Sequence, residues 1–166
     1  MKRVMIFLLV ASQLLIFASS AISYQNEPDG FFDHKWGSNV ESFKKQYKKV
    51  KLVKDGDIAW YLPNSGYARF SGVTVYTTYQ FYHDELFFVN LYFDLGKGEK
   101  LEKAIRVSFG DPTVEEDKFK EWRGDKTGIS FDYDKQLISF WSQKMMLRAD
   151  LAAAAEADKA KEEKKK

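Results

Sequence analysis

Residues Val73 to Leu95 read VTVYTTYQFYHDELFFVNLYFDL, which is the longest run with the alternation of a β-strand. This run predicts two long strands that fold back on each other at His83-Asp84-Glu85. Because successive side chains of a strand point to opposite sides, alternate residues share one face. The face expected in the core carries Val73, Val75, Thr77, Tyr79 and Phe81, then Phe87, Val89, Leu91, Phe93 and Leu95. We expect the remaining elements to pack against this hairpin.

The opposite face of the hairpin differs from an ordinary surface in contact with water. It carries Thr74, Tyr76, Thr78, Gln80 and Tyr82, then Leu86, Phe88, Asn90, Tyr92 and Asp94. Tyrosine supplies a large rigid contact area together with a hydroxyl, which is typical of interaction sites. The candidate binding face for a protein or a small ligand therefore consists of Tyr76, Tyr82, Phe88 and Tyr92. The alternative is that a helix or the C-terminal segment covers this face.

Two amphipathic helices are predicted, each followed by a group of strands. Ser38-Asn39-Val40-Glu41 matches a capping box, in which Ser38 caps a helix over residues 39–48 and Glu41 reaches back to it. A second helix is predicted over residues 99–109, with Gly110 in the left-handed position that ends many helices. Further strands are predicted within residues 51–62, 67–70, 121–123, 128–133 and 136–143, and Thr113 to Asp117 is expected to be an acidic loop.

This order predicts an α+β fold in which two short helices pack on one face of a mostly antiparallel sheet meander. A helix followed by strands occurs twice, which indicates a tandem repeat. Residues 31–143 are expected to form the single domain, and residues 22–30 a flexible lead-in. Residues 144–166 are rich in alanine, lysine and glutamate and are expected to form a solvent-exposed helical tail, since no large side chain follows Leu151.

Residues 1–21 have the anatomy of a secretory signal peptide. Lys2 and Arg3 precede an apolar run, and Ser19-Ser20-Ala21 supplies the small residues that a signal peptidase needs. The alternative, a membrane anchor, is disfavoured because the run is shorter than the roughly 20 residues of a spanning helix. We therefore expect an exported protein, with cleavage after Ala21 or Ser20 and no transmembrane helix in the mature chain.

The chain contains no cysteine. This excludes disulfides, thiolate metal sites, cysteine nucleophiles and the lipid-attachment cysteine of a bacterial lipoprotein. A bacterial protein of the periplasm or exterior, without a lipid anchor, is the favoured interpretation. Removing Lys2 and Arg3 from the 26 basic residues leaves 24, which equals the number of acidic residues. A net charge near zero gives no electrostatic reason to expect a nucleic-acid partner, and the sequence indicates no particular oligomeric state.

Several short motifs carry a resemblance to known domains. They are Lys35-Trp36-Gly37-Ser38 at a helix start, Phe109-Gly110-Asp111-Pro112 at a helix stop, Trp122, and Ser139-Phe140-Trp141 near the end of the domain. Together they resemble a group of small exported bacterial α+β domains of unknown function, over about Phe31 to Ser142. The order of helix and meander is more distantly similar to the β-lactamase-inhibitor-like fold. The resemblance implies no catalytic residues.

No combination of residues predicts a catalytic site, a metal site or a cofactor. The best candidate is His83-Asp84-Glu85 at the hairpin tip, which would need His34 and Asp33 as further ligands. Two histidines are few for such chemistry, so a polar turn is the favoured interpretation. An exported, non-enzymatic binding protein is therefore the leading hypothesis. The alternatives are a small metal-dependent hydrolase using His83, Asp84 and His34, or an envelope structural protein that docks through its tail.

Overall fold

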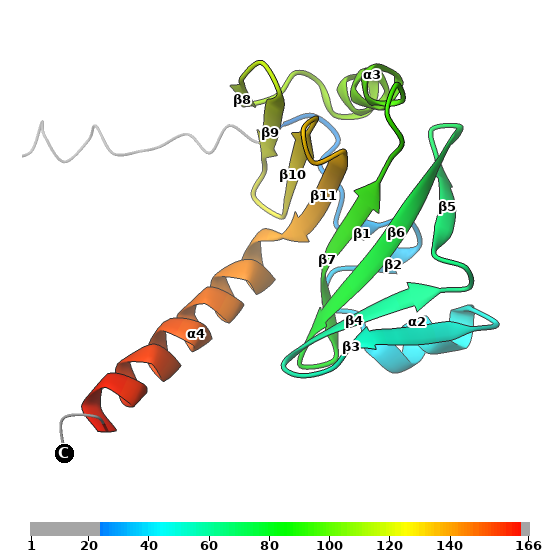
Figure 1. Cartoon of the computed structure of the whole chain (residues 1–166). Helices are drawn as coiled ribbons and strands as arrows, with labels where there is room; N and C mark the ends of the chain where they lie inside the picture. The colour runs from blue at the N-terminus through cyan, green and yellow to red at the C-terminus, as the bar shows by residue number, and fades with distance from the viewer. Residues whose placement is uncertain (1–23, 164–166) are drawn as a thin grey trace, which may run out of the picture.

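The structure is a computed structural model that describes residues 24–163 (Figure 1). The predicted signal peptide, residues 1–21, lies outside the described residues. The strands are β1 (Gly30–Phe31), β2 (His34–Lys35), β3 (Val50–Lys54), β4 (Ile58–Pro63), β5 (Tyr67–Phe70), β6 (Val73–Tyr82), β7 (Glu85–Tyr92), β8 (Val114–Glu115), β9 (Phe119–Arg123), β10 (Thr127–Asp132) and β11 (Leu137–Ser142). The helices are α2 (Val40–Gln46), α3 (Gly98–Phe109) and α4 (Gln143–Glu163). The predicted α+β class is confirmed.

Within residues 24–163, nine strands form one antiparallel sheet in the order β3-β4-β6-β7-β11-β10-β9-β8, and β5 pairs with β6. Each half of the chain contributes a helix followed by a meander, α2 with β3 to β7 and α3 with β8 to β11. The two halves join through their last strands, where Val89 pairs with Phe140 and Leu91 with Ile138. The β6–β7 hairpin therefore lies at the centre of the sheet, as the alternation predicts.

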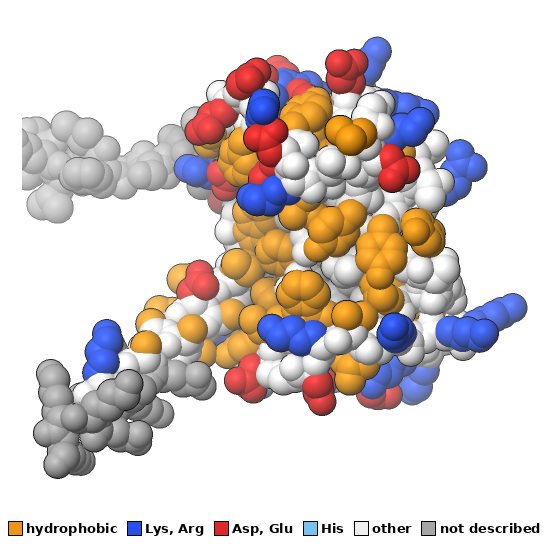
Figure 2. Space-filling model, in the orientation of Figure 1, with side chains coloured by type: hydrophobic (Ala, Val, Ile, Leu, Met, Phe, Trp, Pro, Cys, Tyr) orange, Lys and Arg blue, Asp and Glu red, His pale blue; other side chains and the backbone are white. Residues whose placement is uncertain are grey.

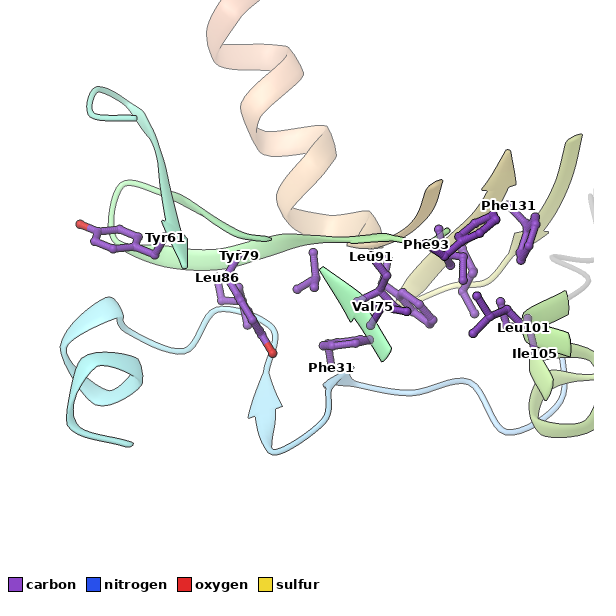
Figure 3. Packing of buried hydrophobic residues seen from close by; sticks show 14 of the residues in the cluster. Phe31, Tyr61, Val75, Tyr79, Leu86, Leu91, Phe93, Leu101, Ile105 and Phe131 are labelled. Atoms are coloured by element: carbon purple, nitrogen blue, oxygen red, sulfur yellow. The ribbon is translucent and has the colours of Figure 1, made fainter. Parts of the chain in front are cut away.

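One face of the sheet, called the first face here, carries the main core. Val40 and Phe43 of α2, Leu101 and Ile105 of α3, and Phe31 of β1 all belong to one buried apolar cluster with this face. The two predicted helices thus share a face, as expected. The opposite face of the sheet is called the second face here. Figure 3 shows the labelled side chains Val75, Leu91 and Leu101 on the first face, while α4 lies against the second face.

The hairpin tip is bonded to the segment that precedes α2. The Gly37 N–H donates to the Leu86 carbonyl at 2.8 Å, and the Leu86 N–H donates to the Ser38 carbonyl at 2.9 Å. The Val40 N–H, at the first turn of α2, donates to the Asp84 carbonyl at 2.8 Å. The last of these bonds satisfies an N–H group that a helix start leaves unpaired. The tip of the hairpin therefore positions α2 on the first face.

A β-bulge in β7 changes the predicted faces of the hairpin. Gln80 pairs with Phe88 but Phe81 pairs with Leu86, so Phe87 is an extra residue in β7. A bulge places two residues against one on the partner strand and interrupts the alternation. Leu86, expected on the second face, is fully buried in the main core, while Phe87, expected in the core, packs in a separate cluster on the second face.

The prediction for Leu95 is also wrong. Leu95 lies beyond the end of β7 and is 82% exposed. The other expected core positions of the hairpin are confirmed as buried, namely Val73, Val75, Thr77, Tyr79, Phe81, Val89, Leu91 and Phe93. The alternation thus fails only at the bulge and after the strand has ended.

The start of α2 differs from the predicted capping box by one residue. Asn39 is the N-cap, and its Oδ1 accepts a hydrogen bond from the Glu41 N–H at 2.8 Å. The Ser38 hydroxyl is buried and has no hydrogen-bond partner among the described residues. Asparagine and serine are about equally good N-caps, so the pattern alone could not choose between neighbours. The end of α3 lies at the predicted glycine, whose N–H donates to the Arg106 carbonyl. Gly110 combines a φ of 82° with a ψ of −165°, however, so the predicted left-handed conformation is wrong and the residue adopts another conformation that is open to glycine.

The segment after α3 and the tail contain further differences. The expected acidic loop from Thr113 to Asp117 includes the short strand β8, which pairs with β9. The tail is helical as predicted, but one side of its first turns is covered, because Met145 is buried against the second face. Figure 1 shows α4 running away from the sheet after this contact.

Replacing the two neighbouring residues at the start of α2 separates the two possible caps. Asn39→Ala should lower the free energy of unfolding by about 1 kcal/mol, because the Glu41 N–H loses its acceptor. Ser38→Ala should change it by less than about 0.5 kcal/mol, because the hydroxyl has no partner to lose. Urea unfolding of both variants and the parent protein measures the difference. A larger loss in Ser38→Ala than in Asn39→Ala would contradict the assignment of Asn39 as the cap.

Candidate functional site

Cross-strand pairing arranges the second face of the sheet in rows. The first row runs across β5, β6 and β7, where Tyr67 pairs with Tyr76 and Tyr76 with Tyr92. The ring centroids lie 5.5 Å apart in the first pair and 6.2 Å apart in the second. Tyr67 is 65% exposed and Tyr92 is 36% exposed. Three neighbouring tyrosines thus form a continuous aromatic row that no other described element covers.

The second row consists of small uncharged polar side chains. Thr78 pairs with Asn90, and Asn90 pairs with Ser139. The Ser139 hydroxyl donates to the Asn90 Oδ1 at 2.7 Å. All three residues are buried, although neither helix of the first face reaches them. The larger aromatic side chains on either side of this row account for the burial.

The third row contains Gln80, Phe88 and Trp141, which pair across β6, β7 and β11. The rings of Phe88 and Trp141 lie 6.1 Å apart, with an angle of 15° between their planes. Trp141 pairs with Gly128 of β10, and a Cβ on Gly128 would lie 2.1 Å from the Trp141 ring. The indole therefore lies directly over the glycine, and any larger residue at position 128 would displace it.

A second glycine supports the tyrosine row in the same way. A Cβ on Gly66, in the turn before β5, would lie 2.5 Å from the Tyr76 ring. Glycines beneath aromatic rings let the rings lie close to the backbone. Tyr76 and Trp141 are thus held in place from below, while each remains partly exposed. Figure 2 shows the resulting apolar patch across the middle of the molecule.

The first turns of α4 cover the end of the second face near the hairpin tip. Tyr82 and Phe87 form a buried cluster with Met145, and partly buried Met146 and Ala149 pack against it. The Arg148 guanidinium lies over the Tyr82 ring and donates to the Glu85 carboxylate at 2.6 Å. This contact, together with the burial of Met145, fixes the direction in which α4 leaves the sheet.

The four residues predicted for the binding face are therefore not equivalent. Tyr76, Phe88 and Tyr92 keep exposed surface, whereas Tyr82 is 6% exposed beneath α4. We use the term open face for Tyr67, Tyr76, Phe88, Tyr92 and Trp141 with the polar side chains between them, Thr78, Gln80, Asn90 and Ser139. Tyr67 and Trp141 were absent from the sequence prediction. Both stand in predicted strands, but only the sheet order shows that they continue the face of the hairpin.

The two histidines do not form a common site. His34 is buried, and its Nε2 shares a hydrogen bond with the Tyr47 hydroxyl at 2.9 Å. His83 is exposed at the two-residue hairpin turn, where its φ is 47° and that of Asp84 is 64°. Glu85 is engaged by Arg148. Within residues 24–163, no group of three histidine or carboxylate side chains is placed to hold a metal ion.

Comparisons of the chain with protein-family models, with curated proteins and with solved structures found no match. The resemblance to small exported bacterial domains therefore stays a prediction from the quoted motifs. No helix in the described part of the chain combines the length and the apolar character needed to cross a membrane.

Alanine substitutions of two tyrosines on the second face distinguish its covered part from its open part. Tyr82→Ala should lower the free energy of unfolding by about 3 kcal/mol, because it leaves a cavity beneath α4. Tyr92→Ala should lower it by less than about 1 kcal/mol, because this side chain is partly in water. Chemical denaturation checks both values. If both variants lost the same free energy of unfolding, Tyr92 would have to be covered in solution.

His34 should make folding stability depend on pH. Burial lowers the pKa of His34 below its usual value of 6.5, an effect that the nearby Asp33 carboxylate partly offsets. Below pH 6.5, His34 therefore binds a proton more readily in the unfolded chain than in the folded chain, and the free energy of unfolding falls as the pH drops. His34→Gln should reduce this slope between pH 6.5 and the carboxylate range near about 4, whereas exposed His83→Gln should retain it. Unfolding free energies across this range provide the test, and an unchanged slope in His34→Gln would contradict it.

Proposed function

We propose that this protein is an exported, non-enzymatic binding protein that holds a protein or small-ligand partner on its open face. The observation that carries the proposal is the row of Tyr67, Tyr76 and Tyr92, which remains uncovered beside a part of the same face that α4 buries. Large aromatic side chains dominate the energetics of many interfaces because they bury much area at little entropic cost. The signal-like residues 1–21 and the absence of cysteine support export without a lipid anchor.

The geometry of the rings also supports binding. Gly66 and Gly128 lie beneath Tyr76 and Trp141, so these rings are already positioned before a partner arrives. A preformed surface loses less conformational freedom on binding than a flexible one. Contiguous exposed aromatic side chains on a folded domain commonly mark an interaction site.

The hydrolase alternative is less well supported by the arrangement of its candidate residues. A shared site would need His34 and His83 to approach one substrate. His34 is buried with Tyr47, whereas His83 is exposed at the hairpin tip. The tip also uses its backbone to hold α2, so it has little freedom to rearrange.

A double substitution on the open face tests the proposal. Tyr76→Lys with Tyr92→Lys should abolish partner retention, because two charges replace the aromatic row, while the thermal unfolding midpoint changes little. Leu95→Lys is the matched control, since Leu95 is 82% exposed and lies outside the open face. The tagged mature proteins are incubated with envelope extract of the source cells, and retained components are quantified by mass spectrometry. Equal retention by the double variant and the parent protein would contradict the proposal, as would unfolding of the double variant.

A further inference from the structure

We infer that the open face binds a neutral saccharide chain. This inference rests on the proposed function, because it names the chemical class of the partner that the same face holds. It combines the nearly parallel rings of Phe88 and Trp141, the tyrosine row, and the uncharged polar row between them.

The aromatic rings suit the apolar side of a sugar ring. The indole of Trp141 lies flat over Gly128, and the plane of Phe88 is tilted by only 15° from that of Trp141. A pyranose ring presents C–H groups on its broad side, which pack well against a flat aromatic surface. Two aromatic rows with a polar row between them can contact successive units of one extended chain.

The open face offers hydrogen-bonding groups that the protein itself does not use. The Gln80 side chain has no hydrogen-bond partner among the described residues, and Asn90 has one only at its Oδ1. The Thr78 hydroxyl also lacks a partner, but it has no accessible surface and is not available to a ligand. An amide side chain can donate and accept at the same time, as neighbouring sugar hydroxyls require. Unused buried polar groups are rare in folded proteins and call for an explanation.

The charge of the surface favours a neutral ligand. None of the nine residues of the open face is charged. At its margins, Lys54 sits over the Trp60 ring and Arg123 pairs with Glu121 at 3.0 Å. Glu121, Arg123 and Asp150 also rim a pocket of about 420 Å³ beside Trp141. Such a balanced margin attracts neither an anion nor a cation strongly.

An extended peptide fits the open face less well. Peptides that join a sheet do so at its edge, through unpaired backbone groups. The backbones of β6, β7 and β11 are already paired on both sides within the sheet. A partner that lies across these three strands can therefore use only side chains, which here are aromatic rings, hydroxyls and amides, whereas β5, which carries Tyr67, pairs only with β6. A polyhydroxylated chain matches these groups along its whole length.

A substitution on each face of the sheet provides a matched test. The Thr77 hydroxyl is buried without a partner and faces the main core, whereas Gln80 belongs to the open face. Valine has nearly the shape of threonine, and methionine nearly the length of glutamine, so Thr77→Val and Gln80→Met should each keep or raise the thermal unfolding midpoint. Only Gln80→Met should weaken saccharide binding, by about fivefold, as expected for one lost hydrogen bond. Asn90→Ala provides a second open-face variant.

Binding is measured by isothermal titration calorimetry of the mature protein with cellohexaose, maltohexaose and N-acetylchitohexaose. At least one of them should bind the parent protein and Thr77→Val equally, and Gln80→Met and Asn90→Ala more weakly. No binding up to about 10 mM, where even a complex with a Kd of about 1 mM would be nearly saturated, overturns the inference. Equal affinity in Thr77→Val and Gln80→Met also overturns it if Asn90→Ala folds and binds normally.

A titration with a peptide distinguishes failure of this inference from failure of the proposed function. An uncharged peptide of glycine, threonine and tyrosine is titrated against the parent protein and the Tyr76→Lys, Tyr92→Lys variant. If the peptide binds through the tyrosines and no hexasaccharide binds, the saccharide inference is overturned while a binding role of the open face stands. If the double variant binds a hexasaccharide as well as the parent does, both are overturned.

Discussion

The pairing of β6 with β7, and the bulge that it contains, is the constraint on which the rest of the structure depends. Opposite Gln80 the chain inserts Phe87, so that Leu86 points into the main core while Phe87 and Phe88 belong to the second face. Without the extra residue, a regular alternation would place Leu86 on the second face and Phe87 in the core. The bulge therefore supplies both faces of the sheet with apolar side chains at the same point of one strand. It also lies next to the tip that holds the start of α2.

The composition of α4 decides how much of the second face stays open. Its large apolar side chains that contact the sheet, Met145 and Met146, lie in the first turn, and the later contacts come from Ala149 and Ala152. Alanine adds little buried area per residue, so the helix gains almost nothing by following the sheet further. The cover consequently ends after Tyr82 and Phe87, and the tyrosine row remains uncovered. A tail with leucines at the later contact positions would be expected to bury the row and remove the candidate site.

Much of the fold could be predicted from residue patterns. The alternation from Val73 to Tyr82, the two helices and the position of Gly110 are local features, each set by side chains a few residues apart. The bulge could not be predicted, because it arises from a mismatch in length between two paired strands. The residue pattern of β7 alone does not show which residue is the extra one. The choice of Asn39 over Ser38 as the cap also depends on tertiary contacts, since the Ser38 carbonyl is bonded to Leu86. The open face was only partly predictable, because Trp141 joins it through the pairing of β11 with β7, about fifty residues away along the chain.

The unpartnered hydroxyls show why an unsatisfied polar group alone does not mark a site. Thr77 and Thr78 are adjacent, both are buried, and neither hydroxyl has a partner among the described residues. Thr77 lies among apolar side chains of the main core, where a ligand has no access and a hydroxyl only opposes folding. Thr78 lies on the other face beside Gln80 and Asn90, but its hydroxyl is also closed to solvent, so a ligand cannot supply the missing bonds. The amides of Gln80 and Asn90 differ from it because they keep unused hydrogen-bonding groups that are not closed off in this way. Accessibility, and not the missing partner alone, therefore decides which polar groups of the sheet can serve recognition.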